Sequence, residues 1–263
     1  MMLENKVAVV YGAGGSIGGA VARAFADEGA QVFLTGHLLA PVDAVAADIV
    51  AAGGSADAAQ VDALDERAID EHLQSVVERA GKVDVSFNAV GIPDAGVVGV
   101  PLLEVDVERF LRPIEAYTRS YFLTARLAAR RMVTTGSGVI MRVTALHSRT
   151  GIPLVGGYGP AMAAMEALTR QLSAELAPRG IRVVGMRPQA IPESSTIREA
   201  FEPRAAATGL TWEQWEELLA GKTHPRRLMT LEEMAGVAAF LASDRASGLT
   251  GTIVNLTMGS LDD

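Results

Sequence analysis

The sequence predicts an α/β fold in which helices cover both faces of one doubly wound parallel β-sheet. Two observations support this prediction. Residues 6–11 form an apolar run that ends in a glycine-rich turn, and a helix-like pattern follows the turn. Strand-like and helix-like segments then alternate along the rest of the chain. Alternation with short connections is typical of right-handed βαβ units, which build a parallel sheet.

The first unit of the chain is a strand, a glycine-rich turn and a helix. The glycines let backbone N–H groups and the positive end of the helix dipole approach a pyrophosphate closely, because no Cβ intervenes. A glycine pattern indicates dinucleotide binding only when it lies between a strand and a helix, as it does here. The turn residues that we expect to bind a dinucleotide are Gly12, Gly14, Gly15, Ser16, Ile17 and Gly18.

The next elements are expected in alternating order. Strands are predicted at 31–35, 58–62 and 83–88, and helices at 17–28, 41–52 and 66–80. No Pro/Ser-rich linker or break in composition divides the chain, so we expect one domain over residues 1–263.

Composition excludes several functional classes. The formal net charge is −8, with acidic and basic residues interspersed, which argues against a nucleic-acid partner. No apolar run reaches the roughly 18 residues of a membrane span, so we expect no membrane partner. The first strand begins too early for a signal peptide, and a cytoplasmic location is expected. The chain has no cysteine and its four histidines lack ligand spacing, so no metal site is expected.

The second predicted strand ends at Gly36 and His37, where a dinucleotide-binding fold contacts the adenosine ribose. An acidic residue there would bind the 2′-hydroxyl of NAD. Neither residue is acidic, and His37 can donate a hydrogen bond to a 2′-phosphate. The sequence therefore favours NADP(H) over NAD(H). The alternative for His37 is a solvated loop histidine, and the sequence does not choose between the two.

Two further strand ends place polar residues at the edge of the sheet where ligands bind. Asp62 ends one strand, and the run Phe87-Asn88-Ala89-Val90-Gly91 ends another. Together with the glycine turn, these motifs resemble the short-chain dehydrogenases/reductases. The match continues over the rest of the chain: residues 106–132 resemble the long interface helix of that family, and 180–188 its sixth strand and proline turn.

The resemblance implies a single-domain Rossmann fold and a nicotinamide cofactor. Beyond the glycine turn, the residues that we expect to contact the cofactor are His37, Asp62, Asn88, Gly91, Pro188 and Ile191. The family often has a glycine and a threonine where this chain has Gln189 and Glu193. Glu193 could therefore disturb the nicotinamide end of the site.

The resemblance also implies a catalytic set, from which the chain departs. The family has a Tyr-x-x-x-Lys motif, a Ser upstream and an Asn in the long helix. Tyr158 keeps the Tyr, but Met162 and Ala145 stand at the Lys and Ser positions, and Tyr117 (or Ala116 in a shifted register) at the Asn position. Without the Lys charge, Tyr158 should stay a neutral phenol, so carbonyl reduction is expected to suffer less than alcohol oxidation.

Neighbouring residues are candidates to replace the missing groups. Thr144, His147 and Ser148 flank the Ser position. Strand alternation favours a Thr144 that faces the other way, with His147 and Ser148 as ordinary loop residues. Arg142 and Arg149 are candidate cations, although structural ion pairs are the favoured use. Tyr158 itself has an alternative role as a buried phenol bonded to a backbone group.

Three functions fit these residues. The first is an NADP(H)-dependent carbonyl reductase with an atypical site, in which Tyr158 donates the proton. The second is a catalytically silent relative that binds cofactor or forms a subunit, and the third is a non-redox enzyme on the same scaffold. The glycine turn and Asp62 favour the first two, and we take the first as the working hypothesis.

The substrate and assembly expectations come from two other segments. A substrate loop at about 189–225 contains Phe201, Trp212 and Trp215, which favours a small apolar carbonyl or alcohol ligand. Residues 106–132 and 155–178 resemble helices that pair across a two-fold axis in the family, and both carry alanines that permit close packing. Self-association to a dimer or tetramer is expected.

Overall fold

The computed structural model describes residues 1–92 and 98–262, which contain a seven-stranded parallel sheet. The strand order β3-β2-β1-β4-β5-β6-β7 turns back next to β1, which is the point where ligands bind in doubly wound sheets. This topology confirms the predicted fold class. The strands are β1 (Val7–Tyr11), β2 (Gln31–Gly36), β3 (Ser55–Gln60), β4 (Val85–Asn88), β5 (Gly138–Val143), β6 (Ile181–Pro188) and β7 (Thr252–Leu256).

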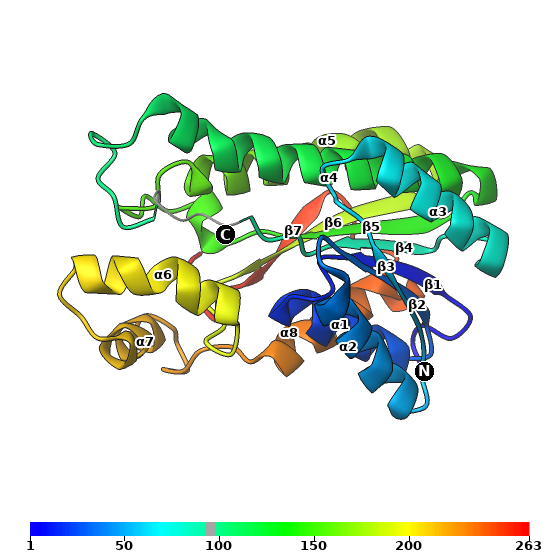
Figure 1. Ribbon diagram of the computed structural model, residues 1–263, viewed down its shortest axis with the longest axis horizontal. Coiled ribbons are helices and arrows are strands. Elements are labelled where there is room, and N and C mark those ends of the chain that lie inside the picture. The colour runs from blue at the N-terminus through cyan, green and yellow to red at the C-terminus, as the bar shows by residue number, and fades with distance from the viewer. Residues whose placement is uncertain (93–97, 263) are drawn as a thin grey trace.

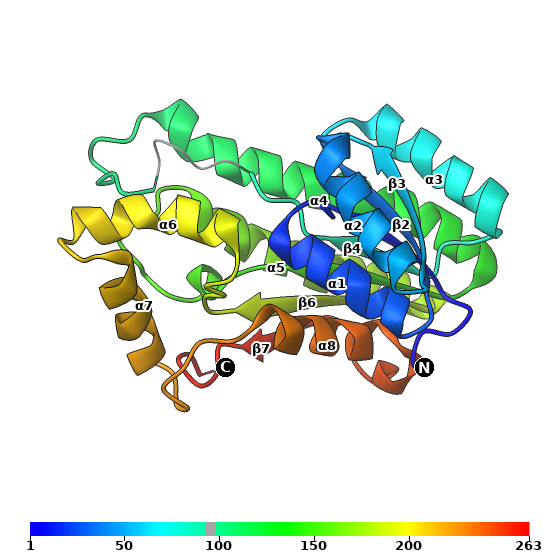
Figure 2. The same ribbon diagram turned by 60° about the horizontal axis from the view of Figure 1, so that its bottom comes forward.

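Helices cover both faces of the sheet (Figures 1 and 2). Helices α1, α2 and α8 pack on one face and α3, α4 and α5 on the other, whereas α6 and α7 lie beyond the carboxyl ends of the strands. The α-helices are α1 (Ser16–Asp27), α2 (Leu39–Ala51), α3 (Glu66–Ala80), α4 (Val107–Thr135), α5 (Tyr158–Leu176), α6 (Ser195–Ala207), α7 (Trp212–Gly221) and α8 (Leu231–Ala242). The short 3₁₀ helices are η1 (Leu146–Ser148), η2 (Ala177–Arg179) and η3 (Asp244–Ala246).

The central strands are apolar because both of their faces are buried. In β1, Val7, Val9 and Tyr11 face one hydrophobic cluster and Ala8 and Val10 face the other, as strand alternation requires. Among the helices of the described residues, none combines the length and apolar character that crossing a membrane needs.

Local sequence signals set several helix ends. Asp65 accepts hydrogen bonds from the first turn of α3, and Thr230 forms a capping box with Glu233 at the start of α8. Gly81 and Gly136 end α3 and α4 in the left-handed conformation, which glycine adopts without steric cost. The Asp65 and Gly81 caps explain why the predicted ends of α3, at 66 and 80, agree with the structure.

Two predicted elements differ from the structure. The third strand was expected at 58–62 but spans Ser55–Gln60, so Asp62 lies beyond the strand. There Asp62 Oδ1 accepts a hydrogen bond from the Leu64 N–H at 2.9 Å, and this turn ends the pairing with β2. The expected substrate loop at 189–225 contains the helices α6 and α7. A capping box at Thr211 starts α7 and is the signal that sequence analysis missed.

Candidate active site

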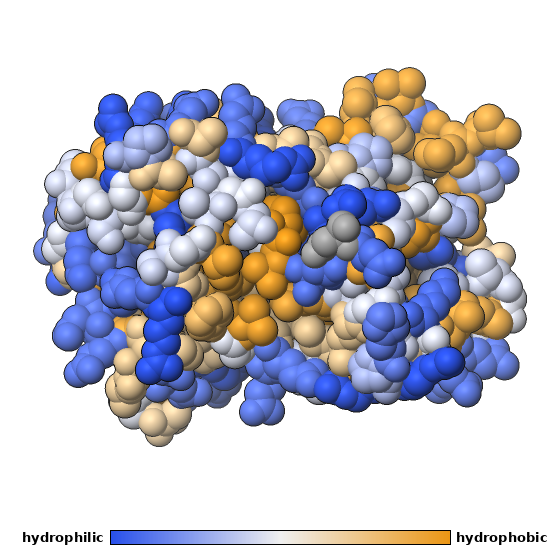
Figure 3. All heavy atoms as spheres, turned by 180° about the vertical axis from the view of Figure 1, so that it is seen from behind, coloured by the Kyte–Doolittle hydropathy of each residue, from blue (hydrophilic) through white to orange (hydrophobic). Residues whose placement is uncertain are grey.

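One cleft of about 1820 Å³ lies at the carboxyl edge of the sheet. Its lining includes the glycine turn, His37 and Asp62 at one end, and Tyr158 and Trp212 at the other. Its volume exceeds the roughly 300–1,000 Å³ of a typical small-molecule pocket, so it has room for a dinucleotide and a second ligand. Figure 3 shows hydrophobic side chains gathered in the middle of the face opposite that of Figure 1.

The glycine turn has the close packing that dinucleotide binding requires. Gly12 has a φ of +76°, and a Cβ at Gly18 would lie 2.2 Å from the Gly12 carbonyl oxygen. No side chain caps the N-terminus of α1, and its first turn has no acidic residue. The free N–H groups in the first turn of α1 therefore lie at the cleft wall, where they can donate to a phosphate.

The adenosine end of the cleft is formed by β2 and the turn after β3. His37 is largely exposed, and its Nδ1 lies 3.9 Å from Asp62 Oδ2. Among the described residues that line this end, from Gly36 to Val42 and from Val61 to Leu64, none is a lysine or arginine. Asp62 and His37 are thus the two groups available to a ribose.

The buried side chain of Asn88 makes hydrogen bonds to other residues of the protein. Its side chain is 1% exposed, and its Nδ2 donates to Ser120 Oγ at 3.0 Å and to Thr124 Oγ1 at 2.9 Å. Its Oδ1 accepts from the Val90 N–H at 3.0 Å and from Arg142 Nη1. These bonds fix the end of β4 against α4, and the expected contact of Asn88 with a cofactor stays a prediction.

Of the other residues expected to contact the cofactor, some line the cleft and one lies behind it. Gly91 and Pro188 line the cleft at the ends of β4 and β6. Ile191 is fully buried, and its side chain packs into the core on the α8 side of the sheet. The side chain of Ile191 therefore supports the site from behind.

Tyr158 lies at the start of α5 and lines the cleft. Three aromatic rings surround it: Tyr117, His147 and Phe201, with ring centroids 5.9, 5.2 and 6.2 Å away, all edge-on. This geometry is typical of favourable aromatic pairs. The rings hold Tyr158 in one orientation at the cleft wall.

Ala145 and Met162 line the cleft near Tyr158 but supply neither a hydroxyl nor a charge. Ala145 precedes η1 and is 6% exposed, and Met162 lies one turn after Tyr158 on α5 and is 2% exposed. Both side chains belong to the hydrophobic cluster beneath α4 and α5. Apolar groups therefore form this part of the wall.

Comparison with known proteins identifies the family. A family model described as Enoyl-(Acyl carrier protein) reductase matches residues 12–260. An uncharacterised oxidoreductase of Methylorubrum extorquens is 31% identical over 258 residues, 98% of each chain. The chain belongs to the short-chain dehydrogenase/reductase family.

Two solved members of this family share the fold and contain cofactor. The NAD⁺-bound xylitol dehydrogenase matches with a TM-score of 0.91 and 27% identity, covering 98% of this chain and 100% of the other. A 7α-hydroxysteroid dehydrogenase complexed with NADH and 7-oxo glycochenodeoxycholic acid matches with a TM-score of 0.85 and 27% identity, covering 99% and 96%.

His147 is not the ordinary loop residue that we expected. Its ring stacks on Phe201 at 5.4 Å and contacts Tyr158 edge-on. Burial, with a smaller effect from the Arg204 charge, lowers the pKa of His147 to about 3. At neutral pH the imidazole is therefore uncharged, and it forms part of an aromatic wall of the cleft.

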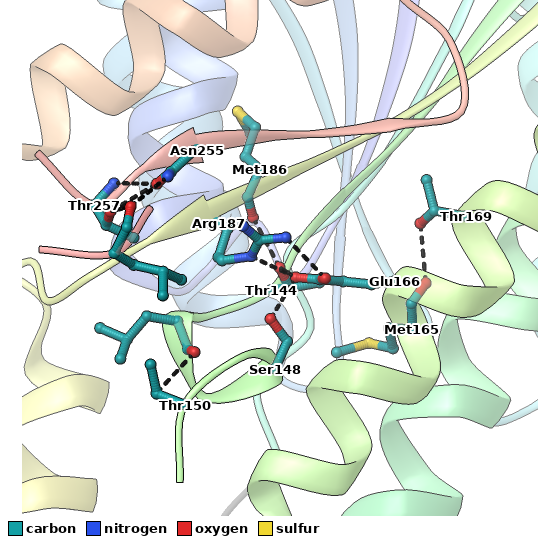
Figure 4. A network of polar contacts seen from close by, with 12 residues as sticks. Thr144, Ser148, Thr150, Met165, Glu166, Thr169, Met186, Arg187, Asn255 and Thr257 are labelled. Atoms are coloured by element: carbon teal, nitrogen blue, oxygen red, sulfur yellow. Dashed lines mark hydrogen bonds and ion pairs between the residues drawn. The ribbon is translucent and has the colours of Figure 1, made fainter. Parts of the chain in front are cut away.

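The hydroxyl groups of Thr144 and Ser148 bond to a buried ion pair and do not point into the cleft as donors for a ligand (Figure 4). Thr144 Oγ1 and Ser148 Oγ donate to Glu166 Oε1 at 3.0 and 2.6 Å. Arg187 Nε donates to the same oxygen at 2.8 Å, and its Nη2 donates to Glu166 Oε2 at 2.9 Å. The network ties the segment after β5 to α5 and β6, and sequence analysis missed it although both charges lie in buried segments.

Arg142 contradicts our expectation of a structural ion pair. It is 2% exposed, and among the described residues no carboxylate contacts it. Burial lowers the pKa of Arg142 to about 10, so its guanidinium stays protonated at neutral pH. The family site thus contains an uncompensated positive charge.

Gln189 and Glu193 both point to neighbouring helices. Glu193 Oε2 accepts a hydrogen bond from the Leu231 N–H at 2.6 Å, at the N-terminus of α8. Gln189 Nε2 donates to the Leu219 carbonyl of α7 at 3.3 Å. The Glu193 carboxylate is therefore occupied at α8, which removes the expected conflict with a nicotinamide.

Helices α6 and α7 contribute aromatic residues to the lining of the cleft. Phe201, Trp212 and Trp215 line it and belong to a small hydrophobic cluster. Arg204 lies over the Trp215 ring, with its Cζ 4.7 Å from the centroid. These residues belong to the segment that the sequence predicted as a substrate loop, and the structure shows it as helices.

Proposed function

We propose that this protein binds a nicotinamide dinucleotide, NADP(H) in preference to NAD(H), and reduces the carbonyl group of a small apolar molecule, with Tyr158 as proton donor. One observation carries the proposal. The uncapped glycine turn and Tyr158 line one continuous cleft. Family membership supports the same reaction class.

The residues present fit the dinucleotide. A Cβ at Gly12 would collide with the backbone of Ala89, and one at Gly18 with the backbone of Gly12. The free N–H groups at the start of α1 would hold the pyrophosphate. Asp62 and His37 would contact the ribose of the adenosine. When bound, the reduced nicotinamide supplies the hydride for the carbonyl carbon.

The chain's own residues carry out the remaining steps. Tyr158 Oη donates the proton to the carbonyl oxygen, while Phe201 and Trp212 exclude water from the substrate. Ala145 provides no hydrogen-bond donor to that oxygen. Loss of such a donor typically costs about 10²–10³ in rate, so we expect slow turnover.

The choice of NADP(H) depends on His37. No acidic side chain ends β2, and the His37 imidazole can donate to a 2′-phosphate. The Asp62 carboxylate lies 3.9 Å from that ring and would oppose the phosphate. The NAD⁺ and NADH complexes of the two solved relatives favour the opposite choice. The assignment is tested by measuring the dissociation constants of NADPH and NADH. A clear preference for NADH would overturn it.

The apolar wall at α6 and α7 supports an apolar substrate. The related 7α-hydroxysteroid dehydrogenase is complexed with 7-oxo glycochenodeoxycholic acid, a ketone on an alicyclic ring, which supports the same class of ligand here. We therefore propose cyclic ketones as the substrates to examine first.

The rival function is a catalytically silent relative that binds cofactor. It is favoured by one observation, the apolar Ala145 and Met162 beside Tyr158.

The test is oxidation of NADPH by the pure protein, followed by absorbance, with a panel of cyclic ketones. We expect activity that is lost in Tyr158→Phe and kept in Tyr11→Phe, a buried tyrosine outside the cleft. Dinucleotide binding without reduction of any ketone would establish the silent relative. Activity that survives in Tyr158→Phe would remove Tyr158 as the proton donor.

A further inference from the structure

Arg142 is a buried cation to which the proposed mechanism assigns no role. It lies on β5 beside the cleft, and its Nη1 donates to the Asn88 side-chain oxygen and, at 3.4 Å, to the Asn88 carbonyl. Its Nη2 donates to the Val90 carbonyl at 3.3 Å. Among the described residues, its buried Nε has no hydrogen-bond partner. These neutral oxygens orient the guanidinium but do not cancel its charge.

The groups that face this charge are phenols. Arg142 Cζ lies 5.4 Å from the centroid of the Tyr117 ring, and that ring contacts Tyr158 edge-on. The charges of Tyr117, Tyr158 and Tyr121 all act to raise the pKa of Arg142, against the larger opposing effect of burial. Such an attraction is reciprocal, because a cation that a phenolate stabilises also stabilises that phenolate.

Several other groups of this region are neutral or lie against other side chains. His147 on η1 is neutral, and Arg204 on α6 lies over Trp215 and acts on His147. Tyr121 on α4 is fully buried, and burial raises its pKa to about 12. Met162 lies one turn along α5 from Tyr158 and has no charge. Arg142 is a buried cation that interacts with Tyr117, Tyr158 and Tyr121 together.

We propose that Arg142 is the cation of this active site and that its guanidinium stabilises the phenolate of Tyr158 across the ring of Tyr117. The inference rests on the proposed function, in which Tyr158 exchanges a proton with the substrate oxygen, and it deepens that function. Tyr158 then transfers its proton at lower pH, and its phenolate can accept the proton of an alcohol. Arg142 acts through Tyr158, as a positioning residue.

The test is an ultraviolet titration of the phenols in the protein without cofactor. The difference between the native protein and Tyr158→Phe gives the titration curve of Tyr158. Tyr11 and Tyr121 do not interfere, because burial raises the pKa of both. Tyr117, the fourth tyrosine, contacts both Arg142 and Tyr158, so the same difference is also measured in Tyr117→Phe, which keeps the ring and removes its phenol. We expect a native midpoint for Tyr158 clearly below the ordinary value of about 10.

Variants of the cation separate its charge from its packing. Arg142→Met should raise the midpoint of Tyr158 by about one pH unit or more, because it removes an opposite charge close to the phenol. Arg142→Lys, which keeps the charge, should stay near the native midpoint. Arg149→Met is the control, because Arg149 is an exposed cation of the same segment. It should have no effect.

Two results would overturn the proposal: a native midpoint at or above about 10, or a folded Arg142→Met variant that titrates like the native protein. If circular dichroism shows that Arg142→Met does not fold, the native midpoint and Arg142→Lys decide. The titration contains no dinucleotide and no ketone. A lowered midpoint in a protein that reduces no ketone would support the role of Arg142 and refute the reductase.

Discussion

The Glu166–Arg187 pair gives a direct test of how the site is held together. We predict that Glu166→Gln destabilises the protein by about 3–5 kcal/mol, the usual cost of breaking a buried ion pair by removing one charge. The two side chains are 4% and 3% exposed, so water cannot compensate the Arg187 charge. Gln keeps one acceptor oxygen, so the bonds from Thr144 and Ser148 weaken without adding a full second cost.

The assay is urea unfolding followed by circular dichroism at one fixed protein concentration, because an oligomer's stability depends on concentration. Arg187→Met should cost a similar amount. The double variant Glu166→Gln/Arg187→Met should cost clearly less than the sum, since neither charge is then left alone. The control is Asp48→Asn, which breaks the exposed Arg23–Asp48 pair and should cost less than about 1 kcal/mol.

Two results would refute this reasoning. A cost below about 1 kcal/mol for Glu166→Gln would mean that the pair behaves like a surface salt bridge. Additive costs in the double variant would mean that the two charges do not stabilise each other.

Three further predictions concern the site and the assembly. Ala145→Ser should raise ketone reduction by about 10²-fold, measured as NADPH oxidation, whereas Met162→Lys should add little if Arg142 already supplies the charge. Gly18→Ala should weaken dinucleotide binding at least about tenfold in a calorimetric titration, because its Cβ would lie 2.2 Å from the Gly12 carbonyl oxygen. Unchanged affinity would argue against this turn as the phosphate site. The control is Gly236→Ala, because Gly236 has open space around it. Light scattering at micromolar concentration should show a dimer or tetramer formed through α4 and α5, and a monomer would contradict this.

Most of the fold could be predicted from the sequence because local signals and global packing agree. Apolar runs that end at or near glycines predicted β1 and β2, and the helix expected at 66–80 corresponds to α3. The strand β3 was misplaced because SADAAQ is neither strongly apolar nor alternating in a way that marks its ends. Its position follows from pairing with β2, which is a tertiary effect.

The site was predictable only where a backbone motif marks it. The glycine turn and Tyr158, which sequence motifs singled out, line one cleft, and their expected roles stay predictions. The roles of Arg142, His147 and Glu166 depend on which residues face them across the fold, and no spacing in the sequence reveals this. A charge within a buried segment was the available signal for Arg142 and Glu166.

The central claim is that the cleft binds a nicotinamide dinucleotide with its reactive end beside the aromatic wall. The chain has two tryptophans, and both Trp212 and Trp215 line this cleft. Titration with NADPH, exciting the tryptophans, should therefore quench their emission and sensitise nicotinamide emission in the same saturable curve, and Gly18→Ala should move that curve to higher concentration. No saturable change with NADPH or with NADH would contradict the claim.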